Sequence, residues 1–352
     1  MSNRLGWGII GCGVIAPTHA DAFRRIEGVE LVRACDLVQS KAEELAERYG
    51  ITHTCADFRE LCADPGVDCV SICTDHASHA KIAAAALDAG KHVLCEKPLA
   101  ISHSQLAHML AAHRRNSGKV FAAVFQHRFD TVYRGLKSLI EKRVFGDLLT
   151  VSVNHLFFRS NEYYRADPWR GKWATEGGAV LINQSIHFID IITWIMGGVE
   201  SVCAAHVNVT RGGVIEAEDT AALALRFRSG CLGTFSATSS SHKEWTTSLA
   251  VCGSRGLVEL RDGAVLRTDF IDAAAQAEAN AQLSAVEKPS EIGTAKPYYG
   301  PSHTAQVADF VDAVRQGRKP FVEACSAAES VQVVLAAYRS ARTGRWERVK
   351  RN

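Results

Sequence analysis

The chain has 352 residues, of which 47% are hydrophobic and 22% are charged, and its formal net charge is +2. These values predict an ordinary soluble globular protein of two domains, and the lack of a long Lys/Arg run argues against a nucleic-acid partner. No apolar run reaches the roughly 18 residues that a membrane span needs. The first predicted strand begins within a few residues of Met1. This leaves no room for a signal peptide, so we expect a cytoplasmic protein with no membrane partner.

The first predicted elements are two apolar runs, residues 8–10 and 29–35, joined by a glycine turn and a helical stretch. Glycine at 11 permits a tight strand-to-helix turn, and glycine at 13 lets backbone N–H groups approach a pyrophosphate. Alanine at 16 allows the helix to pack closely on the strand, and the helix N-terminus favours phosphate. An acid that ends the second run would accept hydrogen bonds from the adenosine ribose. The predicted cofactor contacts here are Gly11, Gly13, Val14, Ile15 and Asp36.

Asp36 also indicates which dinucleotide is bound. A carboxylate at this position repels a 2′-phosphate, and Leu37, the next residue, offers no positive charge in compensation. NAD is therefore preferred over NADP. The alternative is a glycine-rich turn followed by an exposed Asp, but the strand, the helix and the spacing to the acid favour a dinucleotide.

Strands and helices then alternate as far as residue 125. Helices are predicted over 39–49, 58–63, 80–89 and 102–116, and strands over 52–55, 69–73, 92–95 and 120–125. This alternation predicts right-handed βαβ units and a doubly wound parallel sheet, which is a Rossmann domain spanning residues 1–125. In such sheets ligands bind at the carboxyl ends of the strands. The cofactor-lining residues predicted at those ends are Thr74, His76, His79, Glu96, Lys97 and Gln126, and Arg128 is assigned to the substrate.

A metal site is not predicted. His76 and His79 have Asp75 and Cys73 nearby, but no second ligand group with zinc-like spacing accompanies them. The chain has 11 cysteines and no C-x-x-C. Several of these cysteines lie in apolar runs, where cysteine behaves as a small hydrophobe, so we expect reduced, buried thiols.

The pattern changes after residue 125, which predicts a second domain over 126–352. A helix at 133–142 is followed by strand-like runs over 148–158, 199–209, 221–227, 231–238, 247–252, 257–260 and 265–270. Turn residues between them predict an α+β domain with a large, open, mostly antiparallel sheet. An open sheet with one apolar face needs either helices or a second subunit as a cover, so a homodimer or homotetramer through this sheet is expected. Residues 273–297 are predicted as a surface excursion, and two helices with apolar stripes close the chain.

The most informative segment of this domain is 176–194. Asn183, His187 and Asp190 are spaced i, i+4 and i+7, which is one face of a helix whose other faces are apolar. Such a face can simply be solvated, but Lys and Glu are missing from it, which favours a site. A loop upstream holds aromatic residues and arginines that suit sugar or phosphate recognition, or that pack the loop itself. Its predicted site residues are Arg159, Tyr163, Trp169, Arg170 and Trp173.

Three motifs occur in order: Gly11-x-Gly13-x-x-Ala16, Glu96-Lys97-Pro98, and Gly177-Gly178 followed by Asn183-x-x-x-His187-x-x-Asp190. Together they resemble the Gfo/Idh/MocA family of glucose–fructose oxidoreductases and inositol dehydrogenases. The resemblance implies a Rossmann domain and a C-terminal domain whose open sheet often forms the dimer interface. It also implies that Lys97 is the lysine of the family's E-K-P motif and His187 the histidine of its D-x-x-x-H pattern. Asn183 stands where many sugar dehydrogenases of the family have Asp.

The function implied is hydride transfer between nicotinamide and a secondary alcohol or ketone of a sugar, polyol or nucleotide-linked sugar. His187 is the expected base, Lys97 stabilises the reacting oxygen, and Asn183 orients the substrate. Trp169 and Arg170 are expected to border the cofactor or the substrate. The remaining substrate contacts are expected from Arg128, Arg159, Tyr163, Trp173 and Asp190.

Three alternatives remain open at this point. An NAD-dependent glycosidase oxidises its sugar transiently and returns the hydride. A non-catalytic sensor or regulator binds the cofactor alone, although the presence of both Lys97 and His187 argues against this. A reductase uses the same residues in the opposite direction.

Overall fold

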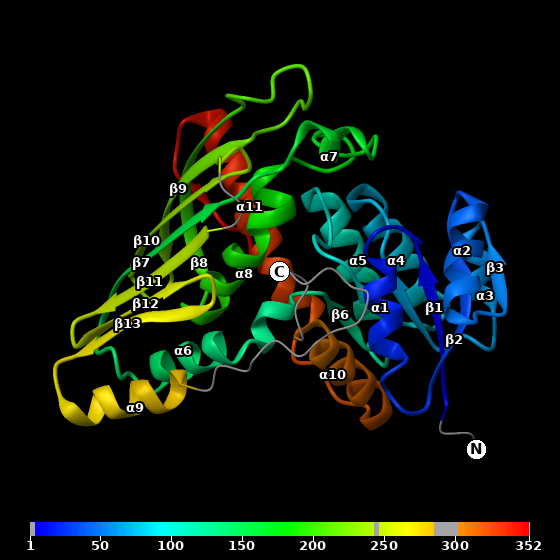
Figure 1. The fold of residues 1–352 in the computed structure, drawn as a ribbon, viewed down its shortest axis with the longest axis horizontal. Coiled ribbons are helices and arrows are strands. Elements are labelled where there is room, and N and C mark those ends of the chain that lie inside the picture. The colour runs from blue at the N-terminus through cyan, green and yellow to red at the C-terminus, as the bar shows by residue number, and fades with distance from the viewer. Residues whose placement is uncertain (1–3, 243–245, 285–301, 352) are drawn as a thin grey trace. The chain divides into compact units, whose positions relative to one another are not determined.

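A computed structural model describes residues 4–242, 246–284 and 302–351 (Figure 1). The chain divides into two compact units. The first comprises Met1–Phe129 and Pro289–Ala328, and the second comprises Asp130–Lys288 and Glu329–Asn352. Each unit therefore contains a stretch from the last part of the chain.

The first unit is built on a parallel sheet with the strand order β3-β2-β1-β4-β5-β6. Its strands are β1 (Leu5–Ile10), β2 (Val29–Cys35), β3 (His53–Cys55), β4 (Cys69–Ile72), β5 (His92–Cys95) and β6 (Phe121–Ala123). The order reverses between β1 and β4, and this switch point is where doubly wound sheets bind ligands. The Rossmann topology that the alternation predicted is confirmed.

Two helices of this unit begin at side-chain caps, and a third ends at a glycine. The helices are α1 (Ala16–Phe23), α2 (Gln39–Tyr49), α3 (Phe58–Ala63), α4 (His79–Asp88) and α5 (His103–Arg115), with short turns η1 (His76–Ser78) and η2 (Gln126–Phe129). The side chains of Asp57 and Ser102 accept backbone N–H groups at the starts of α3 and α5. Gly50 ends α2 with a φ of +70°, a conformation that glycine adopts readily.

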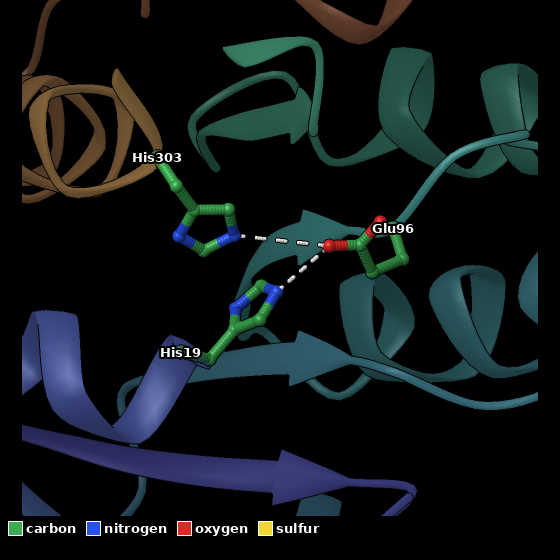
Figure 2. A group of neighbouring side chains, drawn as sticks. All are labelled: His19, Glu96 and His303. Atoms are coloured by element: carbon green, nitrogen blue, oxygen red, sulfur yellow. Dashed lines mark hydrogen bonds and ion pairs between the residues drawn. The ribbon is translucent and has the colours of Figure 1, made fainter. Parts of the chain in front are cut away.

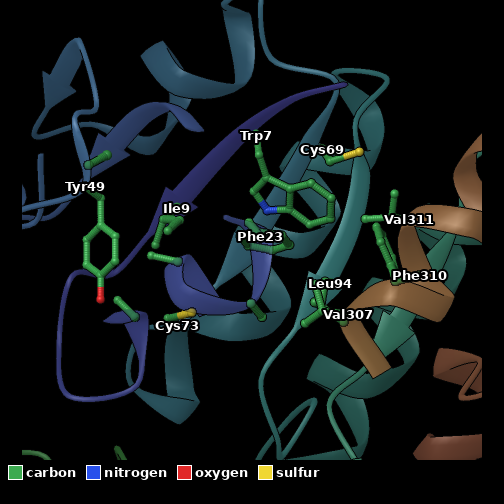
Figure 3. Packing of buried hydrophobic residues seen from close by; sticks show 14 of the residues in the cluster. Trp7, Ile9, Phe23, Tyr49, Cys69, Cys73, Leu94, Val307, Phe310 and Val311 are labelled. Atoms are coloured by element: carbon green, nitrogen blue, oxygen red, sulfur yellow. The ribbon is translucent and has the colours of Figure 1, made fainter. Parts of the chain in front are cut away.

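A late helix completes the core of the first unit. Helix α10 (Ser302–Gln316) packs on α1, and Phe310 lies 5.5 Å from Trp7, ring centroid to ring centroid (Figure 3). Trp7 also contacts Phe23 at 3.9 Å. The sequence pattern predicts a domain boundary between residues 125 and 126, which assigns the helix now called α10 to the second domain. The helix instead belongs to the first unit, because its apolar stripe is buried against Trp7.

The second unit contains an eight-stranded sheet with the order β13-β12-β11-β7-β10-β9-β8-β14. Its strands are β7 (Leu148–Leu156), β8 (Val199–Val207), β9 (Thr220–Phe227), β10 (Leu232–Thr238), β11 (Thr246–Gly253), β12 (Gly256–Arg261), β13 (Ala264–Phe270) and β14 (Glu347–Arg348). All pairs are antiparallel except β7 with β10. The expected open, mostly antiparallel sheet is confirmed, and only the two-residue β14 was not anticipated.

The helical segments of this unit are α6 (Thr131–Glu141), α7 (Asn161–Arg165), the π-helical segment η3 (Val180–Ser185), α8 (Ile186–Ile195), α9 (Ala273–Leu283) and α11 (Ala324–Thr343), which begins in the first unit. Helix α9 corrects the surface excursion expected over 273–297. Alanine has the highest helix propensity, and Asp272 caps the helix by accepting the N–H of Ala275. The rest of that stretch, from residue 285 on, lies outside the described residues.

Side chains along β9 alternate between the two faces of the sheet. Leu223, Leu225 and Phe227 are buried, whereas the residues between them are exposed. Apolar side chains on the other strands also remain exposed, among them Val207 and Leu232, each about half accessible. One face of the sheet therefore belongs to the core, and the other carries accessible apolar groups.

The eleven cysteines, all within the described ranges, form no disulfide. Most are buried as expected, but Cys325 is exposed and three others are partly accessible. Within the described ranges, no helix has both the length and the apolar character to cross a membrane.

Candidate active site

The turn after β1 is tightly packed at Gly11 but open at Gly13, where a ligand has room. Gly11 has a φ of +90°, and a Cβ built there would lie 2.7 Å from the carbonyl group of Cys73. A Cβ built on Gly13 would meet nothing within 4 Å. Ala16 is fully buried at the start of α1, where N–H groups have no preceding helical carbonyl. The turn thus holds the head of α1 close to the sheet and keeps the backbone at Gly13 open.

Asp36 lies at the end of β2, beside this turn. Its Oδ2 accepts the N–H of Cys12 and its Oδ1 accepts the N–H of Val38, both at 2.8 Å. Burial, with the charge of Asp36 as a second cause, raises the pKa of the Cys12 thiol to about 12. An open glycine backbone, a helix N-terminus and a fixed carboxylate make a donor and acceptor set that fits a dinucleotide.

The loop after β4 is fastened to the loop after β5 by His79. Its Nδ1 lies 2.7 Å from the carbonyl oxygen of Pro98, and its Nε2 lies 3.1 Å from that of Thr74. Burial lowers the pKa of His79, whereas the hydrogen bonds to the two carbonyl oxygens act in the opposite direction. His76 is also buried, whereas Thr74 is partly accessible. The buried His79 side chain therefore connects the two loops at the carboxyl ends of β4 and β5.

Glu96 and Lys97 follow β5 directly. The Glu96 carboxylate is buried, with Oε1 3.0 Å from Nε2 of His19 and Oε2 accepting the N–H of Lys97 at 3.2 Å (Figure 2). Lys97 is partly accessible and joins Pro98 through a cis peptide bond. The Glu96 side chain thus fixes the backbone from which Lys97 extends.

Gln126 and Arg128 lie in η2, just beyond β6. Both are buried, and Arg128 is only 2% exposed. Its guanidinium donates to Oγ of Ser326 at 2.9 Å. This burial favours a structural role for Arg128 over the substrate contact that we expected.

The segment with Asn183, His187 and Asp190 is not one continuous α-helix. The π-helical η3 precedes α8, and because a π-turn holds more residues than an α-turn, the expected single face is broken. His187 is partly accessible near the start of α8. Asp190 is fully buried and accepts the hydroxyl of Ser330 on α11 at 2.6 Å. The side chain of Asp190 is therefore buried and hydrogen-bonded inside the protein, which disfavours a substrate contact.

Asn183 contacts Glu176, a buried acid that the sequence analysis did not identify as a site residue. Its amide Nδ2 donates to the carboxyl group of Glu176, which also accepts the N–H of Gly171. Glu176 is fully buried, and this burial raises its pKa to about 7. The only signal in the sequence was an acid directly before Gly177 and Gly178 at the head of an apolar segment.

Glu218 anchors the start of the same segment from the end of a distant loop. Its carboxylate accepts the N–H groups of Ala179 and Leu181 and the hydroxyl of Tyr338, the last at 2.7 Å. Gly178 has a φ of +139°, and a Cβ there would lie 2.0 Å from the Tyr338 hydroxyl oxygen. The backbone before η3 is therefore held by a buried acid that the sequence pattern did not reveal.

The aromatic and arginine residues upstream gather around Tyr163. The guanidinium carbon of Arg170 lies 4.2 Å from the Tyr163 ring centroid, and that of Arg159 lies 5.1 Å from it. Arg170 also covers the Trp169 ring at 4.6 Å, and the Tyr163 hydroxyl accepts Nε2 of Gln184 at 3.0 Å. This cluster joins the loop to η3.

Trp173 does not join that cluster. Its ring packs edge-on against Tyr338, with centroids 5.0 Å apart, and it also contacts His206. Trp173 thus contributes to a small apolar cluster in the second unit, which favours a packing role over the expected substrate contact.

Comparison with known proteins identifies the family. Residues 5–124 match the NAD-binding Rossmann fold of an oxidoreductase family, and residues 137–350 match the C-terminal alpha/beta domain of the same family. The chain belongs to the Gfo/Idh/MocA oxidoreductase family. It is therefore an oxidoreductase enzyme with an NAD-binding domain, as the three motifs predicted.

Relatives in this family have several named activities. An uncharacterized oxidoreductase, YrbE of Bacillus subtilis, is 30% identical over 235 residues, which is 66% of each chain. Myo-inositol 2-dehydrogenase of Thermotoga maritima is 28% identical over 74% of this chain and 78% of its own. The WlbA dehydrogenase of Bordetella pertussis, solved with NADH and UDP-GlcNAcA, superposes with a TM-score of 0.87 at 26% identity over 99% of both chains.

Proposed function

We propose that this protein transfers a hydride between NAD(H) and a secondary alcohol or ketone of a sugar, polyol or nucleotide-linked sugar. One observation carries the proposal: an open Gly13 backbone lies beside a fixed Asp36 carboxylate, in a chain whose family matches extend from residue 5 to residue 350. Residues 1–125 bind the cofactor, with α10 completing their core. Residues 126–352 otherwise provide the substrate site and the oligomer interface.

NAD is the preferred cofactor because of Asp36. Both carboxylate oxygens accept backbone N–H groups, which keeps the negative charge at the tip of β2. The next side chain, Leu37, is 91% exposed and carries no charge. A 2′-phosphate on the adenosine ribose would face this carboxylate without a cation, whereas ribose hydroxyls would donate to it.

The bound nicotinamide supplies a hydride acceptor, and the side chains of this chain handle the proton. His187, whose side chain is partly accessible near the start of α8, takes the hydroxyl proton of the alcohol as the general base. Lys97 donates a hydrogen bond to the same oxygen and stabilises its developing negative charge. Asn183 cannot take up the proton and instead orients the substrate, with its own amide held by Glu176.

The cluster around Tyr163 supports an anionic or nucleotide-linked sugar as the proposed substrate. Arg159 and Arg170 both lie over the Tyr163 ring, and Arg170 also pairs with Asp167 at 2.9 Å; arginines on an aromatic surface suit an anionic or nucleotide-linked sugar. The WlbA relative with UDP-GlcNAcA supports this class, and the myo-inositol dehydrogenase supports a polyol. The accessible apolar face of the eight-stranded sheet supports a homodimer or homotetramer through this sheet.

The experiment is a fluorescence titration of the purified protein with NADH and then NADPH. A panel of polyols, sugars and nucleotide sugars is then assayed with NAD. Tighter binding of NADH and growth of the reduced-nicotinamide absorbance would establish the dehydrogenase and indicate its substrate. Binding without net reduction across the panel would favour a glycosidase with transient oxidation or a cofactor-binding sensor. Failure to bind either nucleotide would refute the proposal.

A further inference from the structure

Three potential metal-ligating side chains converge inside the first unit. His19 comes from α1, Glu96 follows β5 and His303 lies at the start of α10 (Figure 2). Oε1 of Glu96 lies 3.0 Å from Nε2 of His19 and 3.8 Å from Nε2 of His303. One ligand atom from each residue lies within 4.8 Å of the other two. All three residues are buried.

His303 is the member that the hydrogen bonds of the protein leave unexplained. It is 2% exposed, and neither of its ring nitrogens has a hydrogen-bond partner among the described residues. Its Nε2 points toward Glu96, but 3.8 Å is too long for a hydrogen bond. Buried polar groups normally have hydrogen-bond partners. A ring nitrogen that points toward a carboxylate across this gap therefore indicates a bound ion between the two groups.

The spacing fits a small divalent cation. With bonds of about 2.0–2.1 Å, tetrahedral zinc separates its nitrogen and oxygen ligands by about 3.3 Å. The two measured separations, 3.0 and 3.8 Å, lie on either side of that value. Shifts of about half an ångström or less would therefore bring both histidine–glutamate separations to that value, and all three ligand atoms already lie within 4.8 Å of one another.

His19 also has the outer partner that a ligating imidazole needs. Its Nδ1 lies 3.2 Å from Oγ of Ser71, which in turn accepts Nε1–H of Trp7 at 3.0 Å. A proton on Nδ1 of His19 would be held by Ser71, and the Nε2 lone pair would then face Glu96. Metal-bound histidines commonly have this arrangement.

We propose that His19, Glu96 and His303 bind one divalent cation of the zinc class. Two imidazoles and one carboxylate form a common zinc ligand set with a fourth position left for water or another group. The cation would connect α1, the end of β5 and α10 across the first unit. This set is separate from His76 and His79, for which the sequence suggested no metal.

The test is a metal titration of the full-length protein after dialysis against a chelator. Calorimetry with Zn²⁺ should give one tight site per chain, and Co²⁺ should give the visible absorption of a tetrahedral nitrogen and oxygen site. His303→Gln should weaken Zn²⁺ binding by about a hundredfold or more, since even indirect partners of a zinc ligand change affinity 10–100-fold. His155→Gln, which alters a buried histidine of the second unit, is the matched control and should leave the affinity unchanged.

A second variant provides an independent test in case His303→Gln does not fold. His19→Gln should also weaken Zn²⁺ binding, and thermal denaturation shows whether each variant is folded. The absence of a stoichiometric site in the parent protein would overturn the proposal and leave a hydrogen-bonded His–Glu pair. Equal affinities in the parent and in a folded His303→Gln or His19→Gln variant would overturn it as well. Because the readout is metal binding, the result does not depend on the proposed hydride transfer.

Discussion

Asn183 donates its side-chain amide to the buried carboxyl group of Glu176. The residue that occupies the family's Asp position is thereby coupled to an acid seven positions earlier. Burial raises the pKa of Glu176 to about 7, so its protonation changes within the physiological range. The hydrogen bond between Asn183 and Glu176 therefore joins η3 to a buried acid whose pKa lies near neutrality.

The first prediction concerns stability against pH. Glu176 has a higher pKa when folded than when unfolded, so its favourable contribution is complete below its unfolded pKa of about 4.5 and is lost as pH rises through 7. The free energy of unfolding should fall by up to about 3 kcal/mol across this window. In Glu176→Gln this decline should disappear, which urea denaturation at pH 5 and pH 8 measures. A decline of equal size in the variant would exclude Glu176 as its source.

Lys97→Ala and His187→Ala should separate binding from turnover. Loss of a positioned base or hydrogen-bond donor commonly lowers kcat by about 10²- to 10⁴-fold. NADH binding, followed by fluorescence, should persist in both variants. If either variant no longer binds NADH although it is folded, the role proposed for that residue is wrong.

Asp36→Asn should change cofactor preference. The substitution removes the negative charge and keeps an oxygen that can accept the N–H of Cys12 or Val38. The ratio of NADH to NADPH affinities should shift toward NADPH by about tenfold, which corresponds to about 1.4 kcal/mol. Asp57→Asn, at the partly accessible start of α3, changes the net charge equally and serves as the control. An equal shift in both variants would point to overall charge and away from Asp36.

Gly178→Ala should destabilise the second unit far more than a matched glycine substitution. Both Gly178 and Gly197 have positive φ, at +139° and +80°, but a Cβ at Gly197 meets nothing within 4 Å. Gly197→Ala should cost about 1 kcal/mol from backbone strain alone. Gly178→Ala should cost roughly 3 kcal/mol or more, because its Cβ would overlap the Tyr338 hydroxyl. Similar midpoints of thermal unfolding would contradict this reading of the contact.

Most of the fold could be predicted because apolar periodicity and glycine spacing are local properties. Every strand from β1 to β13 overlaps a run that the sequence indicated, although several strands extend past it by one to three residues. Helix α9 was missed because it buries only Ala279 and Leu283, so it has no apolar stripe. The π-helical η3 was missed because its backbone depends on Glu218, which is distant in sequence. The His19–Glu96–His303 group was likewise beyond prediction, since no short spacing connects its members.

The return of α10 to the first unit has a consequence for biosynthesis. Strand β6 ends at Ala123, but the helix that covers Trp7 is not complete until Gln316 has been added. At a ribosomal rate of about 5–20 residues per second, roughly 10 to 40 seconds separate these two points. During this interval the apolar surface around Trp7, which Phe310 later covers, is not yet covered by α10. A gene fragment that stops after β6 would leave the same surface uncovered permanently.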